Sequence, residues 1–312
     1  MSAGSVNADI GPGISGRVSV IIPVATDAEG LRETLGSLRR QTMAATDFEV
    51  IVGNDGGYEE ISAICREFGV IEVVIKPNRG AYAARNAALR KSTGSFLAFT
   101  DADMSLAPDW CEAGRRALAE SDYCGGPINF VSSGRAGIAE MYQACYAFQT
   151  KREFKDVGYF PTANLWVKRG VFRDVGLFDE RLRSGGDYEF GSRVGRTGRY
   201  TQKFADDVVS QHPFRTGSEM VRKIRRTTRG IAFLKDLYPE HYTHLVTGKS
   251  FYRRLIPPRQ LPPSEVPGFQ LSLGQRMAVY CFQYFLKLYA AYILVIGNLG
   301  RRKQTSVGVP TE

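Results

Sequence analysis

The sequence predicts an α/β fold in which helices flank a mostly parallel, Rossmann-like central sheet. In the first hundred residues, short runs of β-branched and aromatic residues alternate with helical patterns about a dozen residues long. Connections of this kind form right-handed βαβ units. Acidic and glycine-rich clusters follow the strands directly, and ligands of such sheets bind beyond the carboxyl ends of the strands. The pattern therefore indicates both the fold class and the functional edge of the sheet.

The predicted elements follow one another closely up to residue 99. β-Branched runs predict strands at 17–24, 48–57 and 70–76, the second of them running into a turn, and a mostly apolar run predicts a fourth strand at 95–99. Apolar spacing and alanine content predict helices that end near Arg40, lie around 58–67 and span 80–92.

Beyond residue 121 the alternation loosens. A further strand is expected within 122–130, and helices are expected over 136–150 and 217–238. Residues 253–275 contain five prolines and predict a linker or a lid-like loop.

The composition is that of a globular protein with an excess of positive charge. Apolar residues make up 43% of the 312 residues, the formal net charge is +9 and the pI is about 9.3. This excess favours an anionic partner, such as a phosphorylated small molecule or an acidic membrane face. Because no nucleic-acid recognition motif accompanies the charge, we expect no nucleic-acid partner.

The cysteines and the N-terminus indicate a cytoplasmic location. The five cysteines are scattered and never form a CxxC pair, so neither a disulfide framework nor a zinc site is expected. Residues 1–16 lack the apolar core and the basic lead of a signal peptide, and we expect a flexible tail there.

The stretch "SFLAFTDADM" ends a predicted strand with two carboxylates, Asp101 and Asp103. In locally extended chain these side chains can converge, and a Mg²⁺ or Mn²⁺ ion that bridges them to phosphate oxygens would relieve their repulsion. The alternative is a solvated turn that caps a helix beginning near Pro108.

Neighbouring motifs favour a nucleotide site at this edge. In "GNDGG", Asp55 is an acceptor on a glycine-rich turn that a ligand can approach closely. In "KPNRGAYAARNAAL", Asn78 and Gly80 precede a predicted helix that carries Arg85 in its second turn. A helix N-terminus with an arginine suits an anion, although a capped surface helix would give the same pattern.

Taken together, these motifs resemble the family 2 glycosyltransferases of GT-A fold. The matching stretches are "VSVIIPV", "VGNDGG", "NRGAYAARNAAL", "FLAFTDADM", "PTANLWVKRGVFRDVGLFDERLRSGGDYEFGSRV" and "HPFR", in the order of the family. The resemblance implies an inverting transferase of hexosyl or related groups. Such an enzyme moves a sugar from a nucleotide-diphosphate sugar to an acceptor hydroxyl.

The resemblance also implies how the nucleotide is bound. Pro23 and the loop after it, with Asp27 or Glu29, would border the base pocket. Asp55 would accept hydrogen bonds from the base or the ribose. Arg85 would lie against the nucleotide, in a nucleotide-binding loop shaped by Asn78 and Gly80. Asp101 would reach the ribose side.

The same resemblance implies roles in the chemistry. Asp187 in "GGDYEF" matches the aspartate that acts as the catalytic base. Asp103, with Asp101 beside it, would bind the Mn²⁺ or Mg²⁺ that neutralises the diphosphate. His212 in "HPFR" matches a histidine that completes the metal site or contacts the diphosphate. The sugar or acceptor pocket would include Asn164, Gly186 and Glu189.

Two positions depart from the family pattern. Gly186 stands where the family has a glutamate, so either Glu189 or nothing replaces its acceptor contacts. Asn54 replaces the first aspartate of the family's DDGS motif. The first departure leaves open a catalytically silent subunit that binds nucleotide sugars. A nucleotidyltransferase is a weaker alternative, because the first strand is not followed by a glycine-rich loop with a lysine. A glycosidase would need a paired acid and base and no nucleotide cradle.

The C-terminal third carries basic and apolar patterns. One basic stripe at helical spacing consists of Arg222, Arg225, Arg226 and Arg229. It could be a solvated face, a surface for lipid headgroups or a contact for a diphosphate-linked acceptor. Residues 276–303 predict an interfacial amphipathic helix, with a core or dimer helix as the alternative. Lys287 within this segment argues against a membrane span.

The expected organisation has a catalytic domain at 17–216, with a nucleotide-sugar half at 17–120 and an acceptor half at 121–216. The other expected segments are a basic helical region at 217–252, a Pro-rich loop at 253–275, an apolar helix at 276–303 and tails at 1–16 and 304–312. We expect a UDP-sugar donor, with GDP- and dTDP-sugars as alternatives, and a saccharide or lipid-linked acceptor. The expected place is the cytoplasm or the inner face of the cell membrane, and a homodimer is an open alternative.

Overall fold

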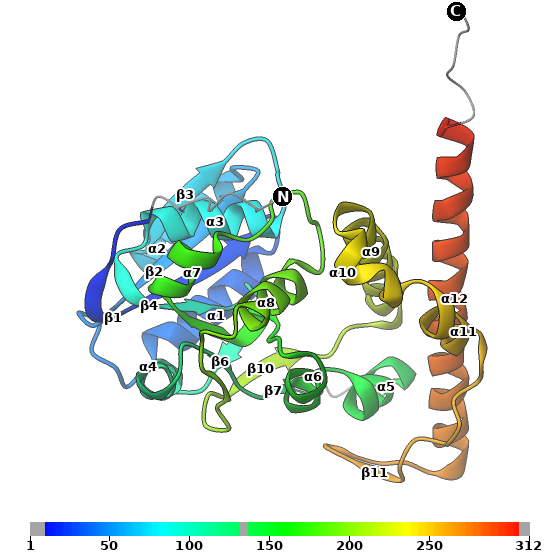
Figure 1. Ribbon diagram of the computed structural model, residues 1–312. Helices are drawn as coiled ribbons and strands as arrows, with labels where there is room; N and C mark the ends of the chain where they lie inside the picture. The colour runs from blue at the N-terminus through cyan, green and yellow to red at the C-terminus, as the bar shows by residue number, and fades with distance from the viewer. Residues whose placement is uncertain (1–9, 132–136, 306–312) are drawn as a thin grey trace, which may run out of the picture. The chain divides into compact units, whose positions relative to one another are not determined.

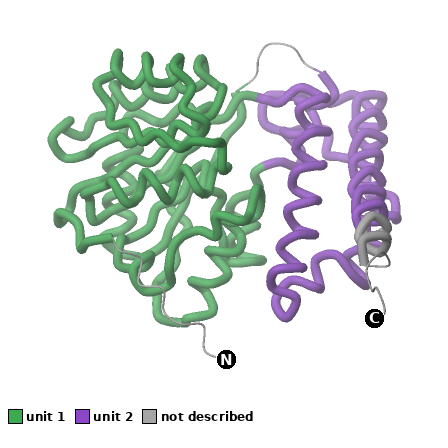
Figure 2. The backbone as a smooth tube through the Cα atoms, turned by 90° about the horizontal axis from the view of Figure 1, so that it is seen from above, with its two compact units in different colours: residues 1–131, 148–213 green, residues 132–147, 214–312 purple. Residues whose placement is uncertain are grey.

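The computed structural model describes residues 10–131 and 137–305, so most of the two expected tails lies outside the described residues. Two compact units are distinguished in Figure 2. Unit 1 comprises residues 1–131 and 148–213, and unit 2 comprises residues 132–147 and 214–312. Residues 132–147, which the sequence placed in the acceptor half, thus belong with the C-terminal helices.

Unit 1 is built on a seven-stranded sheet of order β3-β2-β1-β4-β8-β6-β9 (Figure 1). Its strands are β1 (Ile14–Val24), β2 (Phe48–Asp55), β3 (Ile71–Ile75), β4 (Gly94–Phe99), β6 (Tyr123–Gly125), β8 (Leu165–Lys168) and β9 (Gln202–Phe204). The pairs β1–β2, β1–β4, β2–β3 and β6–β9 are parallel. Strand β8 runs antiparallel to both β4 and β6. The predicted mostly parallel sheet is confirmed, although β1 begins inside the segment expected to be a tail.

Along the chain, the helices of unit 1 are interspersed with these strands. They are α1 (Ala28–Arg39), α2 (Glu59–Phe68), α3 (Ala81–Lys91), α4 (Trp110–Glu120), α6 (Thr150–Val157), η1 (Thr162–Asn164), α7 (Arg169–Val175) and α8 (Gly186–Thr197). The helix predicted over 136–150 is present but shorter than expected. One helix, α5 (Ile138–Tyr146), ends before that segment does, and α6 begins afterwards in the other unit.

A small second sheet brings three distant segments together. Its order is β5-β10-β7, with β5 (Ser105–Leu106), β7 (Ile128–Val131) and β10 (Ser210–Pro213). The single strand expected within 122–130 is therefore two strands in different sheets. The break falls at Gly126, where an added Cβ would lie 2.0 Å from the carbonyl oxygen of Val208. Strand β10 places His212 next to β5, which directly follows the loop after β4.

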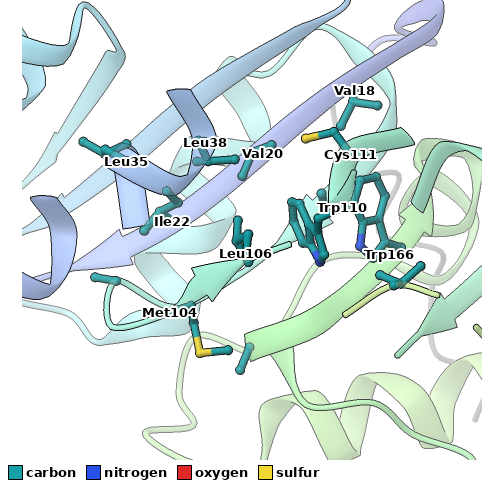
Figure 3. Packing of buried hydrophobic residues seen from close by; sticks show 14 of the residues in the cluster. Val18, Val20, Ile22, Leu35, Leu38, Met104, Leu106, Trp110, Cys111 and Trp166 are labelled. Atoms are coloured by element: carbon teal, nitrogen blue, oxygen red, sulfur yellow. The ribbon is translucent and has the colours of Figure 1, made fainter. Parts of the chain in front are cut away.

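The main core lies on one face of the large sheet, the face that carries Val18, Val20 and Ile22 of β1 (Figure 3). Trp110 of α4 and Trp166 of β8 are fully buried, with ring centroids 4.6 Å apart. Helix α4 can approach this closely only at a glycine, since a Cβ on Gly114 would lie 2.2 Å from the Trp166 ring. The core thus fixes β8 and α4 beneath the loop that follows β4.

Unit 2 is mainly helical, with a short β11–β12 hairpin. Its remaining elements are α9 (Gly217–Leu237), α10 (Pro239–Tyr242), η2 (Thr243–Leu245), α11 (Gly248–Leu255), β11 (Glu265–Val266), β12 (Phe269–Gln270) and α12 (Leu273–Thr305). The prediction of a long helix over 217–238 is confirmed by α9, which opens with a capping box between Thr216 and Glu219. Its four predicted basic residues are exposed.

Helix α12 combines a buried and an exposed side. Met141, Leu271 and Val279 form a small core that joins α5 to the start of α12. The window Leu273–Gly297 is long and apolar enough to cross a membrane by length and composition, and 33% of it is buried. Within it, the ammonium of Lys287 donates a hydrogen bond of 2.5 Å to the carbonyl of Ile256.

Candidate active site

The two aspartates of the DAD sequence lie in the loop that leaves β4 at Phe99. The hydroxyl of Thr34 on α1 donates to the Met104 carbonyl at 2.7 Å and accepts from the Met104 amide at 3.0 Å. The start of α1 packs on the same loop, because a Cβ on Gly30 would lie 2.8 Å from the carbonyl oxygen of Ala102. Helix α1 therefore fixes the loop that carries the carboxylates.

Asp101 forms an ion pair with Arg85 of α3. The Arg85 side chain is only 4% exposed, whereas that of Asp101 is 35% exposed. A buried guanidinium thus lies beneath a carboxylate that reaches solvent. This pairing corrects the assumption that both carboxylates of the DAD sequence are unpaired, because Arg85 already offsets the charge of Asp101.

Asp103 lies against His212 of β10, with Nε2 of His212 3.1 Å from Oδ2 of Asp103. His212 is almost fully buried, and its ring packs on Phe130 and Phe148 with centroids 6.1 and 5.5 Å away. Its Nδ1 is hydrogen-bonded to the carbonyl of Pro213, which can only accept. With Nδ1 as the donor to this carbonyl, Nε2 faces the Asp103 carboxylate either as the second donor of a charged ring or, in a neutral ring, with a lone pair that a cation shared with Asp103 would bind.

Asp55 at the end of β2 is buried and organises the loop before α3. Its carboxylate oxygens accept from the backbone amides of Arg79 and Gly80, each at 2.7 Å. Its carbonyl accepts from the side chain of Asn78 at 2.9 Å. The geometry assigns Asp55 and Asn78 to shaping this loop, as expected for Asn78, while a contact of Asp55 with a nucleotide base stays a prediction.

Asp187 lies in the first turn of α8. Its Oδ1 accepts hydrogen bonds from the hydroxyl of Tyr82 at 3.2 Å and from the amide of Tyr188 at 2.9 Å. In the part of the chain that the structure describes, no hydrogen bond reaches Oδ2. One oxygen of this half-exposed carboxylate is held and the other is available.

Asn164 has a structural role, and its expected place in the sugar or acceptor pocket stays a prediction. Its side chain is buried, its Oδ1 accepts from Trp110 Nε1 at 2.9 Å, and its Nδ2 donates to the carbonyls of Pro127 and Val208 at 3.2 and 2.8 Å. All hydrogen-bonding groups of this amide are thereby used.

Glu189 does not replace the family's glutamate at position 186. It is buried and forms a two-pronged ion pair with Arg193, one turn along α8, with both N–O distances at 2.9 Å. Arg193 in turn donates to the carbonyl of Leu177 at 2.7 Å. The pair ties α8 to the chain before it, and this favours the alternative in which nothing replaces the acceptor contacts of that glutamate.

The residues expected to border the base pocket lie at the junction of β1 and α1. Pro23 is buried next to the carboxyl end of β1. Asp27 is exposed and caps α1 by accepting from the Gly30 amide at 3.0 Å. Glu29 is exposed in the first turn of α1. Their contacts with a base stay predictions.

Sequence reasoning missed two residues of this region. Tyr82, which was seen only as part of an alanine-rich helix, contacts Asp187. Arg183 donates to Oδ1 of Asn78 at 3.0 Å, and its side chain lies over Gly80, where an added Cβ would meet it at 2.8 Å. Both partners are about a hundred residues away in the sequence, so no local pattern indicates them.

The donor atoms at the DAD loop suit a divalent cation that also binds a ligand. Among the described residues no group of three or more His, Cys, Asp or Glu side chains could hold a metal ion. Asp103 and His212 offer two converging donors. Mg²⁺ is commonly held by one or two protein groups together with substrate phosphates. The residues present therefore fit a substrate-completed site.

Residues 19–176, slightly more than half of the chain, match the family model described as glycosyl transferase family 2. The chain belongs to this family. Among its relatives, glycosyltransferase AglE of Haloferax volcanii is 34% identical over 220 residues, which cover 68% of this chain and 72% of that protein. The pre-mycofactocin glycosyltransferase of Mycobacterium tuberculosis is 28% identical over 201 residues, covering 58% of this chain and 39% of that protein.

Solved structures extend the match for this family 2 glycosyltransferase. Mannosyltransferase PcManGT from Pyrobaculum calidifontis, in complex with GDP-Man and Mn²⁺, aligns with a TM-score of 0.54 at 19% identity over 97% of this chain and 79% of that one. TarS of S. aureus, in complex with UDP-GlcNAc, aligns with a TM-score of 0.52 at 19% identity over 69% and 66% of the two chains. The predicted GT-A fold and the prediction of a glycosyltransferase enzyme are confirmed.

Proposed function

We propose that this enzyme is an inverting glycosyltransferase whose catalytic base is Asp187. One observation carries the proposal: Asp187 lies on α8 with Oδ1 held and Oδ2 available, apart in sequence from the paired carboxylates after β4. A base on its own element can face an acceptor while the DAD loop faces the departing group.

In the proposed reaction, Oδ2 of Asp187 takes the proton from the acceptor hydroxyl. The hydroxyl oxygen forms a bond to the anomeric carbon, and the bond from that carbon to the diphosphate breaks with its electron pair on the phosphate oxygen. Because a sugar hydroxyl is a poor nucleophile near neutral pH, a positioned base contributes about 10²- to 10⁴-fold. A single displacement of this kind inverts the configuration.

We propose that the donor is a nucleotide-diphosphate sugar. The buried Arg85 and the N-terminus of α3, which begins after Gly80, suit a phosphorylated ligand. Two structural neighbours were solved with GDP-Man and with UDP-GlcNAc, so a UDP-sugar stays the favoured donor and a GDP-sugar a strong alternative. The dTDP-sugars stay a further prediction.

A divalent cation, Mn²⁺ or Mg²⁺, would be held by Asp103 and His212 with Asp101 beside it, and would stabilise the charge that develops on the leaving diphosphate. The convergence of an imidazole lone pair and a carboxylate oxygen supports this assignment. The Mn²⁺ in the PcManGT complex supports the same choice of metal.

The test is the release of nucleoside diphosphate from a panel of nucleotide sugars, with Mn²⁺ or Mg²⁺, in the presence and absence of acceptors. We expect metal-dependent release that Asp187→Asn abolishes while donor binding persists. Asp103→Ala is expected to weaken metal-assisted donor binding. Donor binding without turnover for any acceptor of the panel would favour the silent subunit instead.

We further propose that unit 2 attaches the enzyme to the inner face of the cell membrane, where it acts on a saccharide or lipid-linked acceptor in the synthesis of surface polysaccharide or glycolipid. Large apolar side chains of α12 are exposed on one helical face, namely Leu273, Met277, Phe285, Leu288, Tyr292, Val295 and Ile296. Exposed basic residues of α9 offer charges for anionic headgroups.

Flotation of the full chain with vesicles of anionic phospholipid tests this attachment. We expect the full chain to bind these vesicles and the double variant Phe285→Ser and Tyr292→Ser not to bind them. Binding to vesicles of neutral phospholipid is expected to be weaker. A chain that ignores the vesicles and forms a dimer through these same residues would overturn the proposal.

A further inference from the structure

Tyr82 makes two hydrogen bonds with one residue of the opposite half of unit 1. Its hydroxyl donates to Oδ1 of Asp187 at 3.2 Å and accepts from the backbone amide of Asp187 at 3.3 Å. The phenol oxygen thus holds the carboxylate and the first turn of α8 together. Because both bonds fall on the same residue, Tyr82 restricts both the position and the rotation of the carboxylate.

The surroundings of Tyr82 keep its hydroxyl protonated. The side chain is only 5% exposed, and burial, followed by the negative charge of Asp187, raises the pKa of Tyr82 well above its ordinary value, while Arg85 opposes this. The ring lies 5.6 Å from the ring of Phe178 and 5.4 Å from the guanidinium carbon of Arg85. The hydroxyl therefore stays a hydrogen-bond donor throughout the neutral range.

The position of this ring requires a glycine at 186. A Cβ added to Gly186 would lie 2.8 Å from two ring atoms of Tyr82 and 2.9 Å from a third. The requirement is one of space, because Gly186 has no positive φ angle. The position at which the family resemblance leads us to expect a glutamate is therefore occupied by the Tyr82 ring.

We propose that Tyr82 is a positioning residue for the catalytic carboxylate and that Gly186 is its matched partner. The proposal rests on the proposed role of Asp187 as the base. The tyrosine hydroxyl holds Oδ1, so that Oδ2 faces the acceptor hydroxyl. The absence of a glutamate side chain at 186 leaves room for the Tyr82 ring, whose hydroxyl holds Asp187. It is therefore not a sign of a catalytically silent subunit.

The central experiment compares steady-state kinetics of the wild type, Tyr82→Phe and Asp187→Asn. Tyr82→Phe keeps the ring and removes only the hydroxyl. A hydrogen bond to a charged group predicts a kcat about 10- to 100-fold lower, with the donor KM and the affinity for nucleoside diphosphate unchanged. Tyr123→Phe is the matched control, since its buried hydroxyl accepts from the Phe160 amide at 3.1 Å. That control is expected to lower the Tm while leaving kcat unchanged.

The outcomes separate the two proposals. If the Asp187→Asn variant is active, Asp187 is not the base, and the proposed function is overturned together with the positioning role of Tyr82. An inactive Asp187→Asn variant together with a wild-type kcat for Tyr82→Phe overturns only the positioning role. An equal loss of kcat in Tyr82→Phe and Tyr123→Phe also overturns it, because the effect would then follow from stability.

The matched pair has a test of its own. Gly186→Ala is expected to displace the Tyr82 ring and to lower kcat by about tenfold or more. In a Tyr82→Ser background the same change is expected to have little further effect, because the ring is no longer there. If the losses from Gly186→Ala and Tyr82→Ser multiply as independent effects, the pairing is rejected.

Discussion

Nε2 of His212 lies 3.1 Å from Oδ2 of Asp103, although Asp103 lies in the loop between β4 and β5 and His212 lies in the distant strand β10. Strand β10 pairs with β5, whose first residue follows Asp103 by two positions. The backbone hydrogen bonds of this sheet therefore determine the distance between the two side chains. The proposed metal site would therefore depend on strand pairing as well as on the two residues themselves.

His212→Ala is expected to raise the Mn²⁺ concentration needed for half-maximal activity by at least about tenfold, because one of two protein donors is lost. Titration of nucleoside diphosphate release with Mn²⁺ measures this. His241→Ala, at an exposed histidine paired with Glu240, is the control and should leave the titration unchanged. An unaltered Mn²⁺ requirement in His212→Ala would place the metal elsewhere.

Arg85→Met is expected to weaken the binding of nucleoside diphosphate by about tenfold, or ~1.4 kcal/mol. Without the guanidinium, the charge of Asp101 is no longer offset and repels the diphosphate. Calorimetric titration gives the affinity. Arg90→Met on the same helix is the comparison, because Arg90 is half-exposed and lies 3.5 Å from Glu180. Equal affinities for the two variants would contradict the role of Arg85.

Gly114→Ala is expected to lower the free energy of unfolding by about 1–3 kcal/mol, since the new Cβ would overlap the Trp166 ring. Gly170→Ala, in α7 with nothing within 4 Å of its added Cβ, is expected to be neutral or stabilising. Urea unfolding followed by tryptophan fluorescence measures both. A stable Gly114→Ala variant would mean that α4 does not pack on β8 as described.

Glu49 is expected to make stability depend on pH. Burial raises the pKa of Glu49, but hydrogen bonds from Ser19 and Thr93 outweigh it and hold the pKa below its ordinary value. The stabilisation is therefore fully present above the ordinary value of 4.5 and is lost as the pH falls through the lowered pKa.

Unfolding of the wild type and Glu49→Gln over a pH series checks this expectation. Their difference in free energy should shrink as the pH falls below 4.5. Glu60→Gln, at an exposed carboxylate, should differ little from the wild type throughout. A difference between wild type and Glu49→Gln that does not change with pH would refute the linkage.

Local patterns were sufficient for the parallel half of the sheet, because each strand from β1 to β4 has its own apolar run and a helical pattern next to it in the sequence. They were insufficient for β8, whose antiparallel place between β4 and β6 depends on partners far along the chain. The break within 122–130 was also missed, since it reflects the close approach of Val208 to Gly126.

The candidate site divides in the same way. The DAD aspartates, Asp187 and His212 were recognisable because their motifs are continuous in sequence. The structural contacts of Asn164 and Glu189 were not foreseen, because a polar side chain shows such a role only through its partners, here Trp110 and Arg193. Tyr82 was missed for the same reason.

Strand β10 also limits which changes of length the chain can accept. Its side chains alternate between buried and exposed, with Ser210 and His212 buried and Gln211 exposed. One residue inserted between β9 and β10 that shifted this register would exchange the two faces and present Gln211 in place of His212. An insertion within 205–209 therefore preserves the position of His212 only if the loop absorbs it and the register of β10 on β5 and β7 stays unchanged.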